Sequence, residues 1–266
     1  MDCSYEIIII DNNSHDKTQE IIPALDNKIK FFPNKTNVGF SQGNNQGFSH
    51  AEGDFILLLN PDAKLMNTDI SKAINFLNTN PNTIIGPKIL NPDLTLQHSV
   101  LNLPSLKNIF LETFFLSYFI PQQTNNKNYA LLGACLLMNR EVYEKLNGFD
   151  ENLFWMDDVD FCFRAKVIGI DCVYFTDWSI IHDSGQSIKK NYNIAISNQL
   201  ISKLKFFKKH DQILNFIFSV ILTEVQIILR IVLFMLLAPF KPLFFKKFVS
   251  YCYSQAKLCK YIFTGR

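Results

Sequence analysis

Four polar clusters, each following an apolar run, contain the residue types that do chemistry in proteins. They lie at Asp11, at Asp62, at Asp157 with Asp158, and at His182. One carboxylate with a neutral imidazole suits a divalent cation such as Mg²⁺ or Mn²⁺, with phosphate oxygens and water completing the shell. Such a cation neutralises a diphosphate leaving group, and a separate carboxylate at a helix start serves as general base for an attacking hydroxyl. Together the clusters indicate a metal–diphosphate site for group transfer.

Each cluster also has a structural explanation when it is taken alone. Asp11 begins a polar turn, whereas Asp157 and Asp158 complement the dipole of a helix N-terminus. A single histidine such as His182 is more often structural than a ligand. What favours a functional interpretation is their joint position, because ligands of open α/β sheets bind at the carboxyl ends of the strands.

The elements that must position these residues alternate between strand and helix signals. Continuous apolar runs at Ile7–Ile10 and Phe55–Leu59 are typical of strands buried on both faces of a parallel sheet. Further strands are expected at 29–32, 84–89, 135–138 and 172–175, and helices at 16–22, 40–51, 69–78, 141–146 and 157–168. Residues 90–128 have no regular pattern. The alternation predicts an α/β fold with a mixed, mostly parallel, Rossmann-like sheet flanked by helices.

The segment NVGFSQGNN at residues 37–45 places small residues and amides around a helix start. Glycine allows close approach of a ligand to the backbone, and helix N-termini favour anions. The segment is neither GxGxxG nor a P-loop. It therefore predicts ligand contact without specifying a nucleotide.

Residues 213–240 differ in kind, because their polar positions form one narrow stripe on an apolar helix. The stripe consists of Asn215, Ser219, Thr223, Gln226 and Arg230. The length is enough to span a bilayer, which needs about 20 residues. However, Glu224 and Arg230 near the middle would each cost about 2.5–3.5 kcal/mol on insertion. We therefore favour a helix that lies in the membrane interface or against a partner over a full span or a plain core helix.

The charge distribution also indicates a membrane-associating tail. Residues 225–266 hold seven Lys or Arg and no Asp or Glu, and because the whole chain carries +2, residues 1–224 carry −5. An acidic body with a basic, apolar tail predicts a globular domain over residues 1–205 and a helical tail at the membrane surface over 206–266. A net charge of +2 is too small for a nucleic-acid binder that works by bulk charge, so no nucleic-acid partner is expected.

The six cysteines and the N-terminus indicate the compartment. The cysteines are scattered without a CxxC pair, which is typical of reduced thiols and argues against a zinc site. The start MDCSYEIIIID has no basic region and only a short apolar run, so it is not a signal peptide. We expect a cytoplasmic protein that is peripheral to the cytoplasmic face of the membrane, with a single span as the alternative.

Five segments in order resemble the family-two glycosyltransferases with the GT-A fold, most closely their rhamnosyltransferase-like branch. Each segment is weak alone, but together they cover most of residues 6–187. The segments are EIIIIDNNSHDKT (6–18), NVGFSQGNNQGF (37–48), FILLLNPDA (55–63), GACLLMNREVYEKLNGFDENLFWMDDVDFCFRAKVIG (133–169) and IIHDSGQS (180–187). The resemblance implies a GT-A-like domain followed by an apolar helical tail.

The resemblance also implies roles for individual residues. Asp62 stands where the family has the metal ligand of its DxD motif, and His182 matches a histidine that supports the metal and the diphosphate. Asp158 is the expected catalytic base, with Asp157 beside it in place of the usual Glu. The nucleotide sugar is expected to contact Asp11, Asn13, Asn37, Gly39, Asn44 and Asn60.

The implied reaction is an inverting transfer from a nucleoside-diphosphate sugar to a hydroxyl group of a cell-surface glycan or lipid-linked acceptor. The donor expected first is dTDP-rhamnose, followed by UDP-hexoses, and the cofactor is Mg²⁺ or Mn²⁺. The base removes a proton from the acceptor hydroxyl, which attacks C1 while nucleoside diphosphate departs.

The chain departs from the family pattern at its start, because the family has a further strand and helix before the equivalent of Glu6–Asp11. We therefore expect no interior strand beside this run, and weak donor binding. One alternative is a catalytically impaired homologue that only binds a membrane or a partner protein. Another is a nucleotidyltransferase, which is disfavoured because no glycine-rich loop with Lys or Arg is found for a nucleoside triphosphate.

Overall fold

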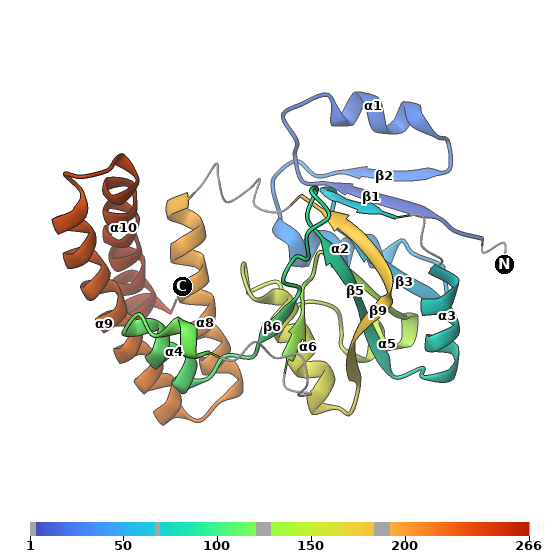
Figure 1. The fold of residues 1–266 in the computed structure, drawn as a ribbon. Coiled ribbons are helices and arrows are strands. Elements are labelled where there is room, and N and C mark those ends of the chain that lie inside the picture. The colour runs from blue at the N-terminus through green and yellow to red at the C-terminus, as the bar shows by residue number, and fades with distance from the viewer. Residues whose placement is uncertain (1–3, 67–69, 121–128, 184–191, 266) are drawn as a thin grey trace. The chain divides into compact units, whose positions relative to one another are not determined.

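The computed structural model describes residues 4–66, 70–120, 129–183 and 192–265 (Figure 1). The chain forms two compact units. The α/β unit comprises residues 1–102 and 123–184, and the helical unit comprises residues 103–122 and 185–266. The helical unit thus begins before the tail expected at residue 206, and it also takes in a segment from the middle of the chain.

The α/β unit is built on a five-stranded mixed sheet in the order β3-β8-β5-β9-β4. Its strands are β3 (Phe55–Leu59), β4 (Ala63–Leu65), β5 (Thr83–Leu90), β8 (Cys135–Asn139) and β9 (Asp171–His182). Only β5 and β9 run parallel, because β8 inserts antiparallel between β3 and β5, and β4 pairs antiparallel with β9. The sheet is mixed as expected, but parallel pairs do not predominate in it.

A separate pair of parallel strands, β1 (Ile7–Asp11) and β2 (Ile29–Pro33), carries the first polar cluster. Helix α1 (Thr18–Leu25) connects the two strands, with Pro23 inside it rather than at its end. Helix α2 (Gly39–Ser49) packs on β1. Within the described residues β1 pairs with β2 alone. The strength of donor binding stays a prediction.

The core of the α/β unit lies between the five-stranded sheet and helix α3 (Ile70–Thr79). Ala73 and Leu77 of α3 are fully buried against Ile85, Leu137 and Trp178. The expected helix start at Asp69 lies outside the described residues. Helices α5 (Arg140–Lys145) and α6 (Asp157–Val167) and the short antiparallel pair β6 (Val100–Asn102) and β7 (Tyr129–Leu131) complete the unit.

Strand β9 is longer than the expected 172–175, because it continues to His182. Its pairing with β5 shifts register between Pro87 and Lys88, and the strand resumes its pairing at Ser179. A bulge bends a strand without ending it. Strand β9, which contacts α6, therefore runs without interruption from Asp171 to His182.

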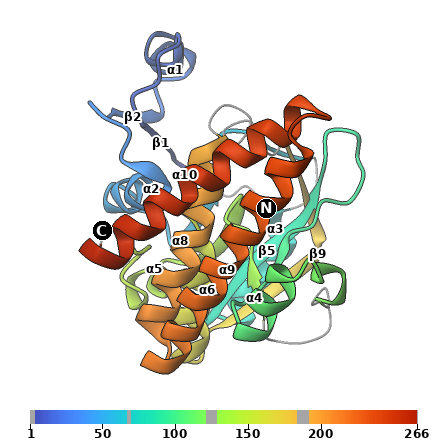
Figure 2. The ribbon, with the colours of Figure 1, turned by 90° about the vertical axis from the view of Figure 1, so that its left-hand side faces the viewer.

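The helical unit packs helices from two distant parts of the sequence side by side (Figures 1 and 2). Its elements are α4 (Leu106–Thr113), η1 (Ser117–Phe119), α8 (Tyr192–His210), α9 (Ile213–Leu237) and α10 (Pro242–Thr264). Helix α9 confirms the expected apolar helix, and it ends before Pro239. Leu204 of α8, Ile227 of α9 and Leu258 of α10 form the centre of its core.

The polar stripe of α9 faces inward, not outward as an interfacial helix would require. Ser219, Thr223 and Gln226 are at most 6% exposed, whereas Phe218 and Ile221 are more than half exposed. One stripe residue also bonds another helix of the unit, because Arg230 Nη2 donates to the Glu112 carbonyl of α4 at 2.6 Å.

Helix α9 is the one helix among the described residues that is long and apolar enough to cross a membrane, with a mean hydropathy of 2.3.

Candidate functional site

Asp62 and His182 meet at one edge of the five-stranded sheet, as the sequence predicted. Residue Ala63 pairs with His182 across β4 and β9, and the Asp62 carbonyl accepts a hydrogen bond from the Asp183 amide. Asp62 Oδ1 lies 3.2 Å from His182 Nε2. His182 is only 6% exposed, so its ring is held in place by the surrounding residues.

A glutamine that the sequence analysis did not single out sets the orientation of the His182 ring. Gln97 Nε2 donates to the His182 carbonyl at 3.1 Å and to Asn91 Oδ1 at 2.8 Å. These bonds direct Gln97 Oε1 towards His182 Nδ1, 2.7 Å away, so Nδ1 carries the proton and donates it. A ring with its proton on Nδ1 alone presents the lone pair of Nε2 towards Asp62.

The resulting pair of acceptors fits a cation. Asp62 Oδ1 is buried and makes no hydrogen bond in the described part of the chain. Two acceptors 3.2 Å apart repel each other unless a cation or an added proton lies with them. Carboxylate oxygen and imidazole nitrogen are ligands for Mn²⁺, and a hydrogen bond from the second ring nitrogen is the usual way of orienting such a histidine. Within the described ranges no cluster of three or more His, Cys, Asp or Glu side chains gathers.

Asp157 and Asp158 begin α6, directly after Met156, whose φ of +67° lies in the left-handed region. A left-handed non-glycine residue is a strained position that often marks functional sites. Asp158 accepts hydrogen bonds from the Gly133 amide through Oδ2 and from the Val159 amide through Oδ1, each at 2.8 Å. The backbone therefore holds this carboxylate in one orientation.

The electrostatics of the two carboxylates suit proton transfer at neutral pH. Burial, and then repulsion from Asp157, raises the pKa of Asp158 to about 7. Burial also raises the pKa of Asp157, against the hydrogen bond that Ser41 Oγ donates to its Oδ2 at 3.1 Å. A carboxylate with a pKa near the working pH is an effective general base. By contrast, the buried Asp160 has a structural role, because it pairs with Arg164 at 2.7 Å.

Asp11 is 4% exposed at the end of β1. Its Oδ1 accepts bonds from Ser14, and Gln19 Nε2 donates to its Oδ2 at 2.9 Å. Burial acts to raise the pKa of Asp11, but the bonds from Ser14 and Gln19 outweigh it and lower the pKa overall. The residue is therefore a fixed anion at neutral pH, suited to accept hydrogen bonds from a ligand.

The amide-bearing residues expected to contact the nucleotide form two groups: Asn37 and Asn44 bond the backbone of α2, whereas Asn13 and Asn60 follow strands β1 and β3. Asn37 and Asn44 serve their own helix, because Asn37 Oδ1 accepts from the Gly39 amide at 2.9 Å and Asn44 Nδ2 donates to the Phe40 carbonyl at 2.8 Å. Asn13 lies in the left-handed region with a φ of +61° and is half-buried beside Asp11. Asn60 uses its backbone to bond the Ala134 carbonyl at 3.0 Å.

Hydrogen bonds join the separate clusters into one continuous edge of the α/β unit. Asn12 Nδ2 donates to the Gly39 carbonyl at 3.0 Å, which connects β1 to α2. The Ser41–Asp157 bond connects α2 to α6, and the Gly133–Asp158 bond connects α6 to β8. The Asn60 amide bonds Ala134, next to Gly133, and so connects this segment to the loop that carries Asp62.

Gly133 packs closely against Asp158 and Phe40. A Cβ at this position would lie 3.1 Å from Asp158 Cβ and 3.3 Å from the Phe40 ring. Gln97 is therefore the structural partner of His182, Ser41 that of Asp157 and Gly133 that of Asp158. Only Gly133 and Ser41 stand in segments on which the sequence resemblance rests, and nothing in the sequence marks Gln97.

Comparison with known sequences shows the family. The profile of glycosyl transferase family 2 matches residues 2–147. The low-salt glycan biosynthesis hexosyltransferase Agl10 of Haloferax volcanii is 24% identical over 60% of this chain, and the chain spans 53% of that protein. The N-acetylglucosaminyl-diphospho-decaprenol L-rhamnosyltransferase of Mycobacterium tuberculosis is 24% identical over 68% of this chain and 67% of its own length. The chain thus spans about half to two thirds of these relatives.

Comparison with solved structures shows the fold. The mannosyltransferase PcManGT from Pyrobaculum calidifontis, solved in complex with GDP-Man and Mn²⁺, aligns with 98% of this chain and 78% of its own, with a TM-score of 0.55 and 13% identity. This likeness confirms the expected GT-A-like fold. Because the profile matches more than half of its residues, the chain belongs to glycosyl transferase family 2.

Proposed function

We propose that the protein is an inverting glycosyltransferase that moves a sugar from a nucleoside diphosphate to a hydroxyl group. The observation that carries this proposal is Asp158, whose carboxylate is fixed by two backbone amides and whose pKa is raised to about 7. Asp158 takes the proton of the acceptor hydroxyl as its oxygen attacks C1 of the sugar. Asp157 beside it raises the proton affinity of the base.

Asp62 and His182 are the residues that would hold Mg²⁺ or Mn²⁺, with the remaining ligands coming from the diphosphate and water. A bound divalent cation supplies charge neutralisation to a departing diphosphate. The chain's own part is to hold the ligands in place. Gln97 fixes the His182 ring, and the pairing of β4 with β9 fixes Asp62.

The donor we propose first is dTDP-rhamnose, with UDP-hexoses as the second choice. The relatives named as rhamnosyltransferases support this order. In this proposal Asp11 accepts hydrogen bonds from the nucleotide, with Asn13, Gly39 and Asn60 as further contacts, and Asn37 and Asn44 shape the start of α2. The direct test is incubation of the purified chain with a panel of nucleotide sugars and a lipid-linked acceptor. The proposal would be refuted if no donor of the panel gave a glycosylated product, even where nucleoside diphosphate is released.

The acceptor we propose is a growing cell-surface glycan on a lipid carrier, reached from the cytoplasmic face of the membrane. Support comes from the exposed apolar residues of α9 and from the seven cationic residues after Glu224. Because the outward face of α9 is apolar along its length, we propose that this face lies in the lipid, as a peripheral anchor or as a single span.

A second function is supported by one observation: in the described part of the chain, β1 pairs with one strand, β2. If the donor pocket needs a strand there, the chain binds a membrane or a partner protein without transferring sugar. Calorimetry with nucleoside diphosphate and Mn²⁺ separates the two functions. Binding supports the transferase, and its absence in a chain that still binds vesicles supports the impaired homologue.

We predict that Gln97→Leu lowers the affinity for Mn²⁺ by about 10–100-fold, the usual effect of removing a group that orients a metal-binding histidine. The measurement is calorimetric titration of Mn²⁺ in the presence of nucleoside diphosphate. Gln97→Glu is the matched control, since it keeps an acceptor for His182 Nδ1 and should lose less. Equal losses in both variants would contradict an orienting role.

We also predict that the chain binds vesicles of anionic lipid more tightly than neutral ones, and that salt weakens this binding without abolishing it. Each cation near the surface contributes about 1 kcal/mol, which salt screens, whereas burial of apolar residues is not screened. Vesicle co-sedimentation of Lys241→Glu/Lys246→Glu should show less binding than the wild type. The control Lys28→Glu/Lys35→Glu makes the same charge change in the α/β unit, and an equal loss there would refute the assignment.

A further inference from the structure

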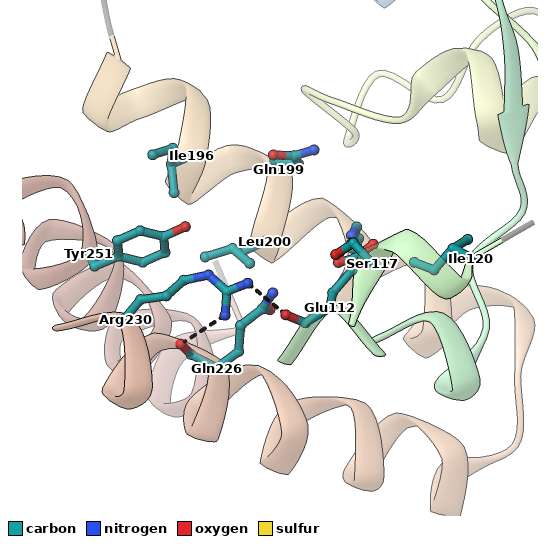
Figure 3. A pocket seen from close by; sticks show the side chains of 10 residues that line it. Glu112, Ser117, Ile120, Ile196, Gln199, Leu200, Gln226, Arg230 and Tyr251 are labelled. Carbon is teal, nitrogen blue, oxygen red and sulfur yellow. Dashed lines mark hydrogen bonds and ion pairs between the residues drawn. The ribbon is translucent and has the colours of Figure 1, made fainter. Parts of the chain in front are cut away.

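The helical unit contains a pocket of about 270 Å³ that lies among α4, η1, α8, α9 and α10 (Figure 3). Its charged and amide lining comes from different helices: Glu112 from α4, Lys203 from α8, and Gln226 and Arg230 from α9. Ile196 and Leu200 of α8 supply apolar lining. The volume is below the roughly 300–1,000 Å³ typical of pockets for drug-sized ligands, so the pocket suits a small polar headgroup and not a whole nucleotide sugar.

The pocket has an excess of positive charge. Lys203 Nζ forms an ion pair with the Glu112 carboxylate, so these two charges compensate each other. Arg230 donates from Nη2 to the Glu112 carbonyl at 2.6 Å and from Nη1 to the Gln226 carbonyl at 3.4 Å. Among the residues that the structure describes, no carboxylate pairs with its guanidinium. Two of the five N–H groups of Arg230 are thus directed at carbonyls, and the others remain for a ligand.

Aromatic rings hold the Arg230 guanidinium where it is. The guanidinium carbon lies 4.7 Å from the centre of the Phe115 ring and 5.9 Å from that of Tyr251. A guanidinium that is packed on rings and bonded to backbone carbonyls loses little further freedom when it binds an anion. The positive group is therefore oriented before any ligand arrives.

The Gln226 side chain provides a second, independent indication of a ligand. The residue is 6% exposed, yet its amide group has no hydrogen-bond partner in the described parts of the chain. Figure 3 shows the side chain extending into the pocket beside Arg230. A phosphate group that accepts hydrogen bonds from the Gln226 amide and from Arg230 would use both of these donors together.

The surroundings of the pocket indicate what such a group is attached to. Ile217, Ile228 and Val232 of α9 and Phe245 and Val249 of α10 are exposed apolar residues of the same unit. A cationic pocket inside a bundle with an apolar exterior suits a molecule with an anionic head and an apolar tail. A phosphate group suits this donor set, because guanidinium, ammonium and amide N–H groups all donate to its oxygens.

We propose that this pocket binds the phosphate or diphosphate headgroup of a lipid. Arg230 and the Gln226 amide donate to the phosphate oxygens, and Lys203 shares its charge between the ligand and Glu112. The phosphate belongs either to a bilayer phospholipid or to an isoprenoid carrier of the glycan acceptor. The proposal concerns binding alone and does not depend on transferase activity.

The test is calorimetric titration of the full chain in neutral detergent with three probes: farnesyl diphosphate, short-chain phosphatidylglycerol and inorganic pyrophosphate. Tightest binding of the first identifies an isoprenoid carrier, of the second a membrane phospholipid, and of the third a free phosphate compound, which would overturn the lipid assignment. No binding of any probe would overturn the proposal as a whole.

Two variants connect the binding to the pocket. Gln226→Leu and Arg230→Gln should each lower the affinity for the tightest-binding probe by about 10–100-fold, which is the usual effect of losing a hydrogen bond to a charged group. Lys257→Gln is the matched control, because it removes a positive charge from α10 outside the pocket. Since Gln226 has no partner to lose, Gln226→Leu should not lower the melting temperature, which separates lost binding from lost folding. Unchanged affinity in both variants would refute the pocket as the site.

Discussion

Asp158→Asn lowers kcat by about 10²–10⁴-fold while the affinity for nucleoside diphosphate stays nearly unchanged. The range is that of a general base in proton transfer, and the selective effect on kcat follows if the carboxylate contacts the acceptor hydroxyl and not the nucleotide. The substitution keeps the size of the side chain and one oxygen that can accept from the Gly133 amide, whereas the bond from the Val159 amide is lost. Steady-state kinetics and calorimetry on the same preparation measure the two quantities.

Asp157→Asn is the matched control for this prediction. Asp157 bonds Ser41 and lies at the start of α6, where acidic residues often only complement the helix dipole. It should therefore lose less activity than Asp158→Asn. A loss at Asp157 alone, or equal losses at both positions, would transfer the catalytic role or divide it between the two.

The raised pKa of Asp158 also predicts the pH dependence. A base must be deprotonated, so kcat should rise with pH up to about 7 and level off above it, and this rise should be absent in Asp158→Asn. The contribution of Asp158 to stability changes with pH in the opposite direction. Because the folded state holds this proton more tightly than the unfolded state, the residue's contribution to stability falls as pH rises from its ordinary pKa near 4 to about 7. Above pH 7, Asp158→Asn should therefore melt at a higher temperature than the wild type.

Asp62→Asn and His182→Ala each abolish the effect of divalent cations on donor binding, and they lower activity by about 10²-fold or more. The reason is that charge neutralisation of a departing diphosphate is worth several kcal/mol. Removal of cations with a chelator should reproduce the loss in the wild type and change the variants little. The measurement is nucleoside diphosphate affinity with and without Mn²⁺.

Asp177→Asn is the control for the metal prediction. Asp177 is an exposed residue of the same strand as His182. Asp177→Asn therefore makes the same change in charge as Asp62→Asn, but away from the Asp62–His182 pair. If Asp62→Asn and Asp177→Asn respond alike to Mn²⁺, the Asp62–His182 pair does not hold the cation. Structural damage is checked separately from the melting temperature of each variant without metal.

The sequence predicted the elements whose physical signal is local. Strands β1, β3 and β8 are continuous apolar runs, and such a run indicates a strand without knowledge of its neighbours. The expectation that Ile7–Ile10 and Phe55–Leu59 are buried on both faces of a parallel sheet was wrong, because β1 lies outside the five-stranded sheet with Ile7 41% exposed, and β3 pairs antiparallel with β8. The pairing of these strands is not local. Nothing in Cys135–Asn139 shows that β8 lies between β3 and β5, so the excess of antiparallel pairs was not predicted. Likewise Thr176 and Asp177 interrupt the apolar pattern of β9, and only its register shift against β5 keeps the strand continuous.

The sequence likewise predicted part of the candidate site, namely its acidic residues, but not their partners. Acidic residues after strands are visible in the sequence, and the structure brings Asp62 to His182 as expected. The partners that tune these residues come from distant segments. Gln97 reaches His182 from a region without periodicity, and Ser41 reaches Asp157 across 116 positions. The helix around Ile109 in that region was also missed, although Ser105 caps it by accepting from the Asn108 amide.

The inward orientation of the polar stripe of α9 has a practical consequence for protein engineering. In a water-soluble bundle, polar substitutions on a helix are tolerated on the face opposite to the core, and here that face is occupied by apolar residues such as Ile217, Phe218, Ile221 and Met235. Their replacement by Glu, Lys or Gln leaves Ser219, Thr223 and Gln226 in contact with the neighbouring helices. A redesigned exterior of this kind would give a form with a more polar surface for crystallisation, in which the pocket, the ring stacking of Arg230 and the whole α/β unit are retained.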